Sequence, residues 1–207
     1  NGGAICWEGA NGAIYDSIFE DNYALNGGAV FVDHDGAFGK IDNCTFTRNI
    51  ADFKGGAVDW NASNGNITNS IFESNSAQYG GATFRGANAT GGYGYNNIYI
   101  SNYAEVNGGA IDWNATGGNI THSKFYNNTA GRNGGAVYVG AVGATAYITD
   151  AIFVNNTAKG NGGAVDWAAS NGHILRSTFE YNNATDGGAV FVGGLGEGGS
   201  IVNSIFN

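Results

Sequence analysis

A two-part motif recurs along the chain, and this repetition limits the fold more than any other feature. The first part is Gly-Gly-Ala followed by a β-branched residue. It starts at Gly2, Gly27, Gly55, Gly80, Gly108, Gly134, Gly162 and Gly187. The second part is an aromatic residue with Asn three positions later. Its aromatic residue is Phe19, Phe46, Phe72, Tyr99, Phe125, Phe153 or Phe179, and Phe206 takes the aromatic position of the eighth copy, one residue before the last. Successive copies of the first part are 25 to 28 residues apart, which identifies a repeat protein.

The composition of the repeat distinguishes between three architectures. Helical repeats use longer units and would not keep two glycines in each, and leucine-rich repeats need more than the three Leu present in 207 residues. Segments such as Ala-Val-Phe-Val and Ser-Ile-Phe are typical of strands bounded by Gly and Asn turns. We therefore predict an all-β fold, a single right-handed parallel β-helix over residues 1–207 with about eight coils of 25–28 residues. Phe should stack inside, and Asn should bond along a ladder of its own.

A second period lies on top of the first. The strand motif of the odd-numbered coils ends in Trp, as in Gly-Gly-Ala-Val-Asp-Trp, whereas that of the even-numbered coils reads Val-Phe-Val, Thr-Phe-Arg or Val-Tyr-Val. The loop that follows is short in odd coils and longer and more variable in even ones. Odd coils start 53, 53 and 54 residues apart, so we infer four two-coil modules of about 53 residues.

The faces of the Val-Asp-Trp strand are assigned by its carboxylate. Side chains alternate along a strand, and an unpaired buried carboxylate is costly, so we expect Asp to face outward and Val and Trp inward. The expected surface ladder is Phe31, Asp59, Phe84, Asp112, Tyr138, Asp166 and Phe191, with Cys6 in the same column. Arg85 argues for the reverse assignment, because it occupies a Trp/Val position. The reverse would expose Trp7, Trp60, Arg85, Trp113 and Trp167.

The pair of motifs resembles known surface proteins. Gly-Gly-Ala-Ile/Val together with Phe-x-x-Asn is similar to the polymorphic outer membrane protein repeats of chlamydial autotransporters, and the chain also resembles the Asn-, Gly- and Thr-rich adhesin-like surface proteins of methanogenic archaea. The resemblance covers Gly2 to Phe206. It implies a β-helix displayed outside the cell for adhesion or envelope structure, and it supplies no catalytic residues.

Composition excludes several functions. Charged residues make up 12% with a net charge of −9 and no basic patch, which argues against nucleic acid as a partner. No apolar run approaches the roughly 18–20 residues that span a bilayer, so we expect no direct membrane insertion. We expect no cofactor and no catalytic residue. The Asp59, Asp112 and Asp166 column repeats without one distinctive site, and its roughly 9–10 Å spacing is marginal for glycosidase chemistry.

Other residues are candidates for modification or binding. Nine Asn-x-Ser/Thr sequons occur, and the expected N-glycosylation sites are Asn61, Asn88, Asn114 and Asn183, although Asn and Thr also serve turns and ladders. Asp33, His34 and Asp35 are the only metal candidates, with a solvated loop as the simpler interpretation. Cys6 is expected to be exposed and able to form an intermolecular disulfide, and no pairing with Cys44 is expected. The sequence Gly194-x-Gly196-x-x-Gly199 lacks the βαβ context of a dinucleotide site and is dismissed.

The repeat is already running at Asn1 and still running at Asn207, and no capping element is recognisable at either end. Because solenoids must protect their terminal edges, we expect self-association through terminal coils or contact with neighbouring coils of a longer chain. The expected function is a non-enzymatic extracellular structural or adhesive β-helix of the cell envelope, either an adhesin stalk segment or a subunit of a filament or sheath. Partners could include glycans or host and cell surfaces. The alternative is a carbohydrate-binding or polysaccharide-degrading β-helix that uses the Asp/aromatic ladder.

Overall fold

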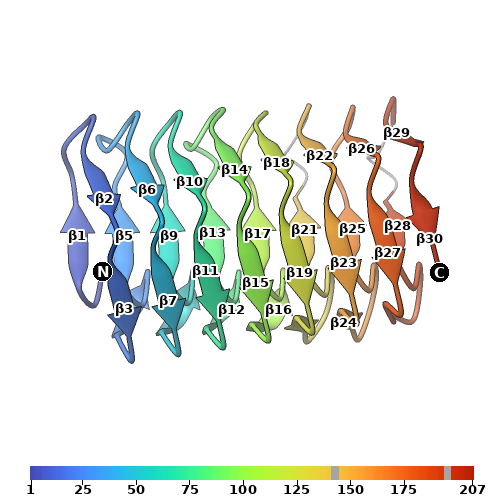
Figure 1. Ribbon diagram of the computed structural model, residues 1–207, viewed down its shortest axis with the longest axis horizontal. Helices are drawn as coiled ribbons and strands as arrows, with labels where there is room; N and C mark the ends of the chain where they lie inside the picture. Colours follow the sequence, from blue (N-terminus) through green and yellow to red (C-terminus); the bar gives the residue numbers. More distant parts are fainter. Residues whose placement is uncertain (141–144, 194–196) are drawn as a thin grey trace.

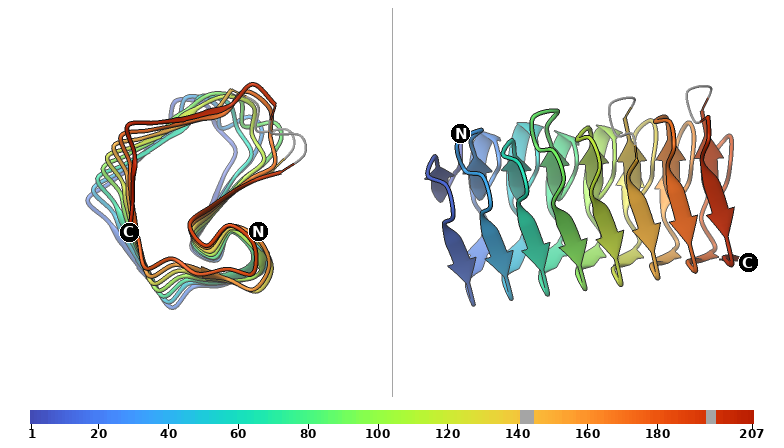
Figure 2. Two further views of the ribbon diagram at one scale, coloured as in Figure 1. Left: turned by 90° about the vertical axis from the view of Figure 1, so that its right-hand side faces the viewer. Right: turned by 90° about the horizontal axis from the view of Figure 1, so that it is seen from above.

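A computed structural model describes residues 1–140, 145–193 and 197–207 of the chain, and in these residues every regular element is a β-strand. Figure 1 shows the strands stacked along one axis from β1 to β30. In the end-on view of Figure 2 the last coil faces the viewer, and the backbone advances toward the viewer counterclockwise, so the solenoid is right-handed. Part of the Gly194–Gly199 motif lies outside the described residues.

The strands form four sheets, each built from equivalent strands of successive coils. Sheet A contains β1 Ile5–Trp7, β5 Val30–Val32, β9 Val58–Trp60, β13 Thr83–Arg85, β17 Ile111–Trp113, β21 Val137–Val139, β25 Val165–Trp167 and β28 Val190–Val192. Sheet B contains β2 Ala13–Tyr15, β6 Lys40–Asp42, β10 Asn66–Thr68, β14 Tyr93–Tyr95, β18 Asn119–Thr121, β22 Tyr147–Thr149, β26 His173–Leu175 and β29 Ser200–Val202. Sheet C contains β3 Ile18–Glu20, β7 Thr45–Thr47, β11 Ile71–Glu73, β15 Ile98–Ile100, β19 Lys124–Tyr126, β23 Ile152–Val154, β27 Thr178–Glu180 and β30 Ile205–Phe206. Sheet D contains β4 Tyr23–Asn26, β8 Ile50–Lys54, β12 Ser76–Tyr79, β16 Tyr103–Asn107, β20 Thr129–Ala130 and β24 Thr157–Ala158.

The parallel pairing confirms the predicted fold class. Within each sheet a strand pairs in parallel with its counterpart one coil later, as Val58 of β9 does with Thr83 of β13. The coil count differs slightly from the prediction. Sheets A, B and C have eight strands, but the eighth coil stops at β30, before a fourth segment. The described stack therefore has about seven complete turns.

The interior is a set of ladders, one from each sheet. Sheet C contributes the predicted aromatic stack, in which successive ring centroids lie 4.6–4.9 Å apart with nearly parallel planes. The centroid separation is close to the spacing of neighbouring strands, so the rings repeat with the backbone. Sheet B contributes mostly Ile and sheet D mostly Ala, so the core stays continuous from coil to coil.

The predicted asparagine ladder stands at the corner between sheets C and D. Its buried members are Asn49, Asn75, Asn102, Asn128 and Asn156. The Nδ2 group of Asn75 donates to Phe46 O (3.0 Å) and to Asn102 Oδ1 (3.0 Å), and the backbone N–H of Asn75 donates to the same Oδ1 (3.0 Å). Each amide thus joins three coils, and it satisfies backbone groups that the corner would otherwise leave unpaired.

The two glycines of each motif have different roles. Gly55 has φ +61°, a conformation that side chains of L-residues rarely adopt. Gly56 is required by close approach, because a Cβ there would lie 2.0 Å from the carbonyl oxygen of Gly81 in the next coil. The pair therefore allows a tight turn between sheets D and A and close stacking of that turn on its neighbour.

The core resolves the orientation of the sheet A strands. Val58 and Trp60 are buried in the core cluster, so the expected assignment of faces is correct and the reversed one is wrong. Trp7 and Trp60 come from alternate coils, yet their ring centroids are 6.0 Å apart, which brings the rings together at the level of the smaller Val32 between them. Large and small side chains in this column therefore follow the two-coil module.

Arg85 points inward despite its charge. Its guanidinium lies between the rings of Trp60 and Trp113, 5.8 and 4.9 Å from their centroids, and its Nη2 donates to Gly65 O (2.9 Å). Burial lowers the pKa of Arg85 to about 10. Indole faces attract cations, which explains how the Trp/Val column accommodates this residue.

Candidate functional site: a groove over sheet A

A groove of about 490 Å³ lies on the outer side of sheet A. Figure 2 shows, end-on, how the backbone folds inward between sheets D and A. The last residues of β8, β12 and β16 form one wall: Phe53, Lys54, Tyr79 and Asn107. The central residues of β13, β17 and β21 form the floor: Phe84, Asp112 and Tyr138. The loops after sheet A form the other wall with Asn61, Gly86, Ala87 and Asn114. The groove therefore crosses several coils.

The expected surface ladder faces away from the core, but it is not exposed. Asp59, Asp112 and Asp166 are only 2%, 1% and 3% accessible. Phe31 (9%) and Phe84 (5%) are also buried, and Tyr138 and Phe191 are half-buried. The prediction of an exposed column is therefore wrong. Its reasoning considered only the two faces of a strand and missed the D–A turns and post-strand loops that rise on both sides of this face.

Asp112 occupies the centre of the groove floor. In the strand register it lies between Phe84 in the coil before and Tyr138 in the coil after. Its Oδ1 accepts a hydrogen bond from Nδ2 of Asn114. Its Oδ2 is buried and has no hydrogen-bond partner among the residues that the structure describes. Burial raises the pKa of Asp112 to about 8, against opposing effects of Lys54 and the Asn114 amide.

Lys54 brings a positive charge to the same groove. Its Nζ lies 4.5 Å from the centroid of Phe84 and 5.0 Å from that of Phe53. Phe53 also meets Tyr79 edge-on, with centroids 5.6 Å apart. These contacts combine a cation, aromatic faces and a carboxyl group, so the groove can contact both apolar and hydrogen-bonding parts of a ligand.

The arrangement around Asp112 recurs in part in the third and seventh coils, whereas the first coil has Cys6 at this position. Asp59 accepts a hydrogen bond from Asn61 Nδ2 (2.9 Å), and burial raises the pKa of Asp59 to about 7. Asp166 has Ala168 where the others have Asn, and burial raises its pKa to about 6. The Asp-Trp-Asn sequence was the signal for the carboxyl–amide pair, since residues two apart on a strand share a face.

Several aromatic side chains that are exposed lie elsewhere. They are tyrosines of sheets B and D, namely Tyr15, Tyr23, Tyr93, Tyr95, Tyr103 and Tyr147. They occupy outward positions of their strands, next to residues such as Ile14 and Ile148 that point inward. Sequence reasoning missed them, because neither the Gly-Gly-Ala nor the aromatic–Asn motif contains these positions.

The acidic loop of the second coil places its two aspartates around His34. His34 Nδ1 lies 2.9 Å from Asp33 Oδ1, and His34 Nε2 lies 3.4 Å from Asp35 Oδ1. The two carboxylates therefore contact opposite edges of the imidazole. Within residues 1–140, 145–193 and 197–207 no group of three or more His, Cys, Asp or Glu side chains is placed to hold a metal ion.

The remaining candidate residues, two cysteines and four sequon asparagines, differ in how exposed they are. Cys6 is exposed in β1, and Cys44 is buried; both thiols are free. Among the four sequons, Asn88 and Asn183 are exposed, whereas the amide nitrogens of Asn61 and Asn114 are engaged by carboxylates of the groove. A glycan on Asn61 or Asn114 would compete with these hydrogen bonds, so Asn88 and Asn183 remain the more accessible proposals.

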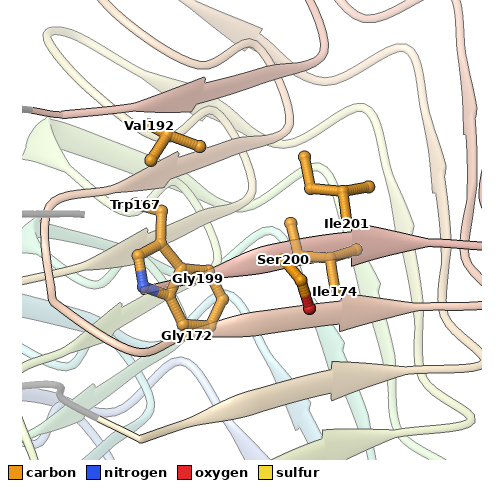
Figure 3. A pocket seen from close by; sticks show the side chains of 7 residues that line it. All are labelled: Trp167, Gly172, Ile174, Val192, Gly199, Ser200 and Ile201. Carbon is orange, nitrogen blue, oxygen red and sulfur yellow. The ribbon is translucent and has the colours of Figure 1, made fainter. Parts of the chain in front are cut away.

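A second, smaller hollow of about 100 Å³ lies at the last described coils. Figure 3 shows Trp167, Ile174, Val192 and Ile201 around it, with Gly172, Gly199 and Ser200. In the second coil the corresponding space beside Val32 adjoins the Trp rings of the first and third coils. The hollow beside Val192 is therefore the place in the core where the inward Trp of an adjacent odd-type coil would pack.

Comparison with known proteins relates the repeat to one family. Residues 122–140 and 150–166 match the model of the Chlamydia polymorphic membrane protein repeat. Both segments run from sheet C to sheet A and contain the aromatic–Asn motif followed by Gly-Gly-Ala. No curated protein and no solved structure gave a significant match. The matched segments support the likeness to chlamydial repeats, and the likeness to archaeal adhesins remains a prediction.

Proposed function

We propose that the chain is part of a non-enzymatic β-helical rod at the cell surface, with a structural or adhesive role. The observation that carries this proposal is the uniform stack, in which the same aromatic and Asn ladders continue through successive coils. Such a solenoid has neighbour-to-neighbour contacts and an extended surface, the properties of a stalk or spacer. The match to a repeat of Chlamydia membrane proteins supports a surface location.

Growth of the rod by further coils is part of the proposal. An additional odd-type coil, in the same polypeptide or in another copy, would place its Trp over the hollow at Val192 and Trp167. That contact would repeat the packing seen where Trp7 and Trp60 meet at the level of Val32. It would serve a longer adhesin stalk and a filament or sheath equally well.

Two measurements test the rod. Antibody labelling of intact cells should detect the protein without lysis, and electron microscopy should show rods or filaments of constant width. Labelling that requires lysis, or compact particles, would overturn the proposal. In the described part of the chain no helix is long and apolar enough to cross a membrane.

The non-enzymatic part of the proposal has its own test. The repeated carboxyl groups have raised pKa values, a property that general acids share. Their arrangement nevertheless recurs in several coils, and among the described residues that line the groove no second carboxyl group accompanies Asp112. Incubation with neutral and acidic polysaccharides should release no reducing ends, and release above a heat-denatured control would contradict this part.

A further inference from the structure

Two oxygen atoms in the groove over sheet A are buried without a partner. They are Asp112 Oδ2 on the floor and Asn107 Oδ1 on the wall at the end of β16, and neither has a hydrogen-bond partner among the described residues. Buried polar atoms are rarely left unpaired, because an unsatisfied group has lost its hydrogen bonds to water and gained none in return. An unpaired carboxyl oxygen beside an open groove therefore indicates a ligand that supplies a polar hydrogen.

The protonation of Asp112 favours a hydroxyl as that ligand group. With a pKa near 8 the carboxyl group changes between its neutral and ionised forms around neutral pH. A hydroxyl both donates and accepts hydrogen bonds, so it can pair with either form. An ammonium ligand would meet the positive charge of Lys54, and an anionic polymer would meet the chain's net charge of −9.

The aromatic residues and the repetition favour a polymer. Phe84 and Tyr138 lie one coil before and one coil after Asp112, so apolar faces alternate with the hydrogen-bonding group along the floor. The Asp59–Asn61 pair repeats the Asp112–Asn114 pair two coils earlier. Asn61 of the earlier pair also lines the groove, so a ligand with a repeating unit, hydroxyl groups and apolar ring faces would contact the amide of one pair and the carboxyl group of the other.

We propose that the groove over sheet A binds a neutral glycan chain laid along the rod axis, with its hydroxyls on Asp112 and Asn107 and a ring face on the half-buried Tyr138. Asn114 positions the Asp112 carboxyl group. Gly140 of the next coil leaves room for Asn114, since a Cβ on Gly140 would lie 1.9 Å from the Asn114 side-chain oxygen. This binding function is separate from the rod function, which does not need a ligand.

The test is calorimetric titration of the whole chain with soluble neutral oligosaccharides of glucose, xylose, mannose and N-acetylglucosamine. At least one series should bind, and longer members should bind more tightly than shorter ones. Asp112→Asn and Tyr138→Ala should each weaken binding about tenfold, the effect of losing one good contact. Asp16→Asn is the matched control, because it removes an exposed carboxylate at the corner between sheets B and C, and it should leave affinity within about twofold.

Three outcomes would overturn the proposal. They are no binding of any neutral series, binding that both groove variants leave unchanged, and binding of polygalacturonate in preference to neutral chains. Circular dichroism and electron microscopy of each variant separate loss of binding from loss of the fold. Rods that fail to bind glycans would overturn the groove proposal alone, and glycan binding by particles that are not rods would overturn the rod alone.

Discussion

Removal of one amide from the Asn ladder should destabilise the solenoid more than its small size suggests. Asn102 is 1% exposed. Its Nδ2 donates to Phe72 O (2.9 Å) and Asn128 Oδ1 (2.9 Å), and its Oδ1 accepts from the backbone N–H and Nδ2 of Asn75 (both 3.0 Å). Asn102→Ala leaves the Phe72 carbonyl and the Asn75 N–H without these partners. Each unsatisfied buried group costs about 1–3 kcal/mol, so the free energy of unfolding should fall by about 2–6 kcal/mol.

Guanidinium titration followed by far-UV circular dichroism and by Trp fluorescence measures this loss. Both probes are needed, because solenoids can unfold in segments and the transitions must coincide before one free energy is assigned. Asn88→Ala is the matched control, since Asn88 is exposed in the loop after β13, and it should change stability by no more than about 0.5 kcal/mol. A loss below about 1 kcal/mol for Asn102→Ala, with an unchanged denaturant slope, would refute the role given to the ladder.

Three further predictions follow from buried groups. The pKa of Asp112 rises from 3.8 to about 8 on folding, so its contribution to stability is present below pH 4 and lost as pH rises toward 8; Asp112→Asn should remove that part of the pH dependence and raise the midpoint of unfolding at pH 8. Arg85→Met should raise the melting temperature, because it replaces a buried cation by an apolar chain, while Arg85→Ala should lower it by leaving a cavity; the opposite order would contradict the inward Arg85. Ellman's reagent should modify one thiol of the folded chain, Cys6, because Cys44 is buried and burial raises its pKa; a second fast thiol, or labelling that survives Cys6→Ser, would contradict the burial of Cys44.

Local repetition made the coil architecture predictable. The aromatic–Asn spacing places both residues at one corner of every coil, and any parallel in-register stack then brings copies of each residue together. The Phe72 ring and the Asn75 amide therefore needed no knowledge of distant contacts. The same holds for the inward Trp60, because alternation along a three-residue strand leaves two choices and the cost of a buried carboxylate selects one.

The groove could not be predicted in this way. Lys54 belongs to the end of sheet D, yet its ammonium lies over Phe84, which follows it by 30 residues. The height of the D–A turn relative to sheet A depends on how two sheets and a loop pack, and no periodicity in the sequence encodes it. That packing buries Asp59 and Asp112. The sequence therefore predicted correctly that these side chains face away from the core, and wrongly that they are exposed to solvent.

The two-coil module couples the core to the groove. In Val58-Asp59-Trp60 the Trp fills the interior and the Asp takes the outer position, whereas Val30-Phe31-Val32 has a small inward residue and an outward aromatic. Because one three-residue strand carries both faces, duplication of the module repeats large and small core residues and acid and aromatic groove residues together. An extra pair of coils would therefore lengthen the rod and add one more Asp-centred site without any new design of the interior. Affinity for a long glycan should then grow with the number of modules, which links the groove to the repeat that builds the rod.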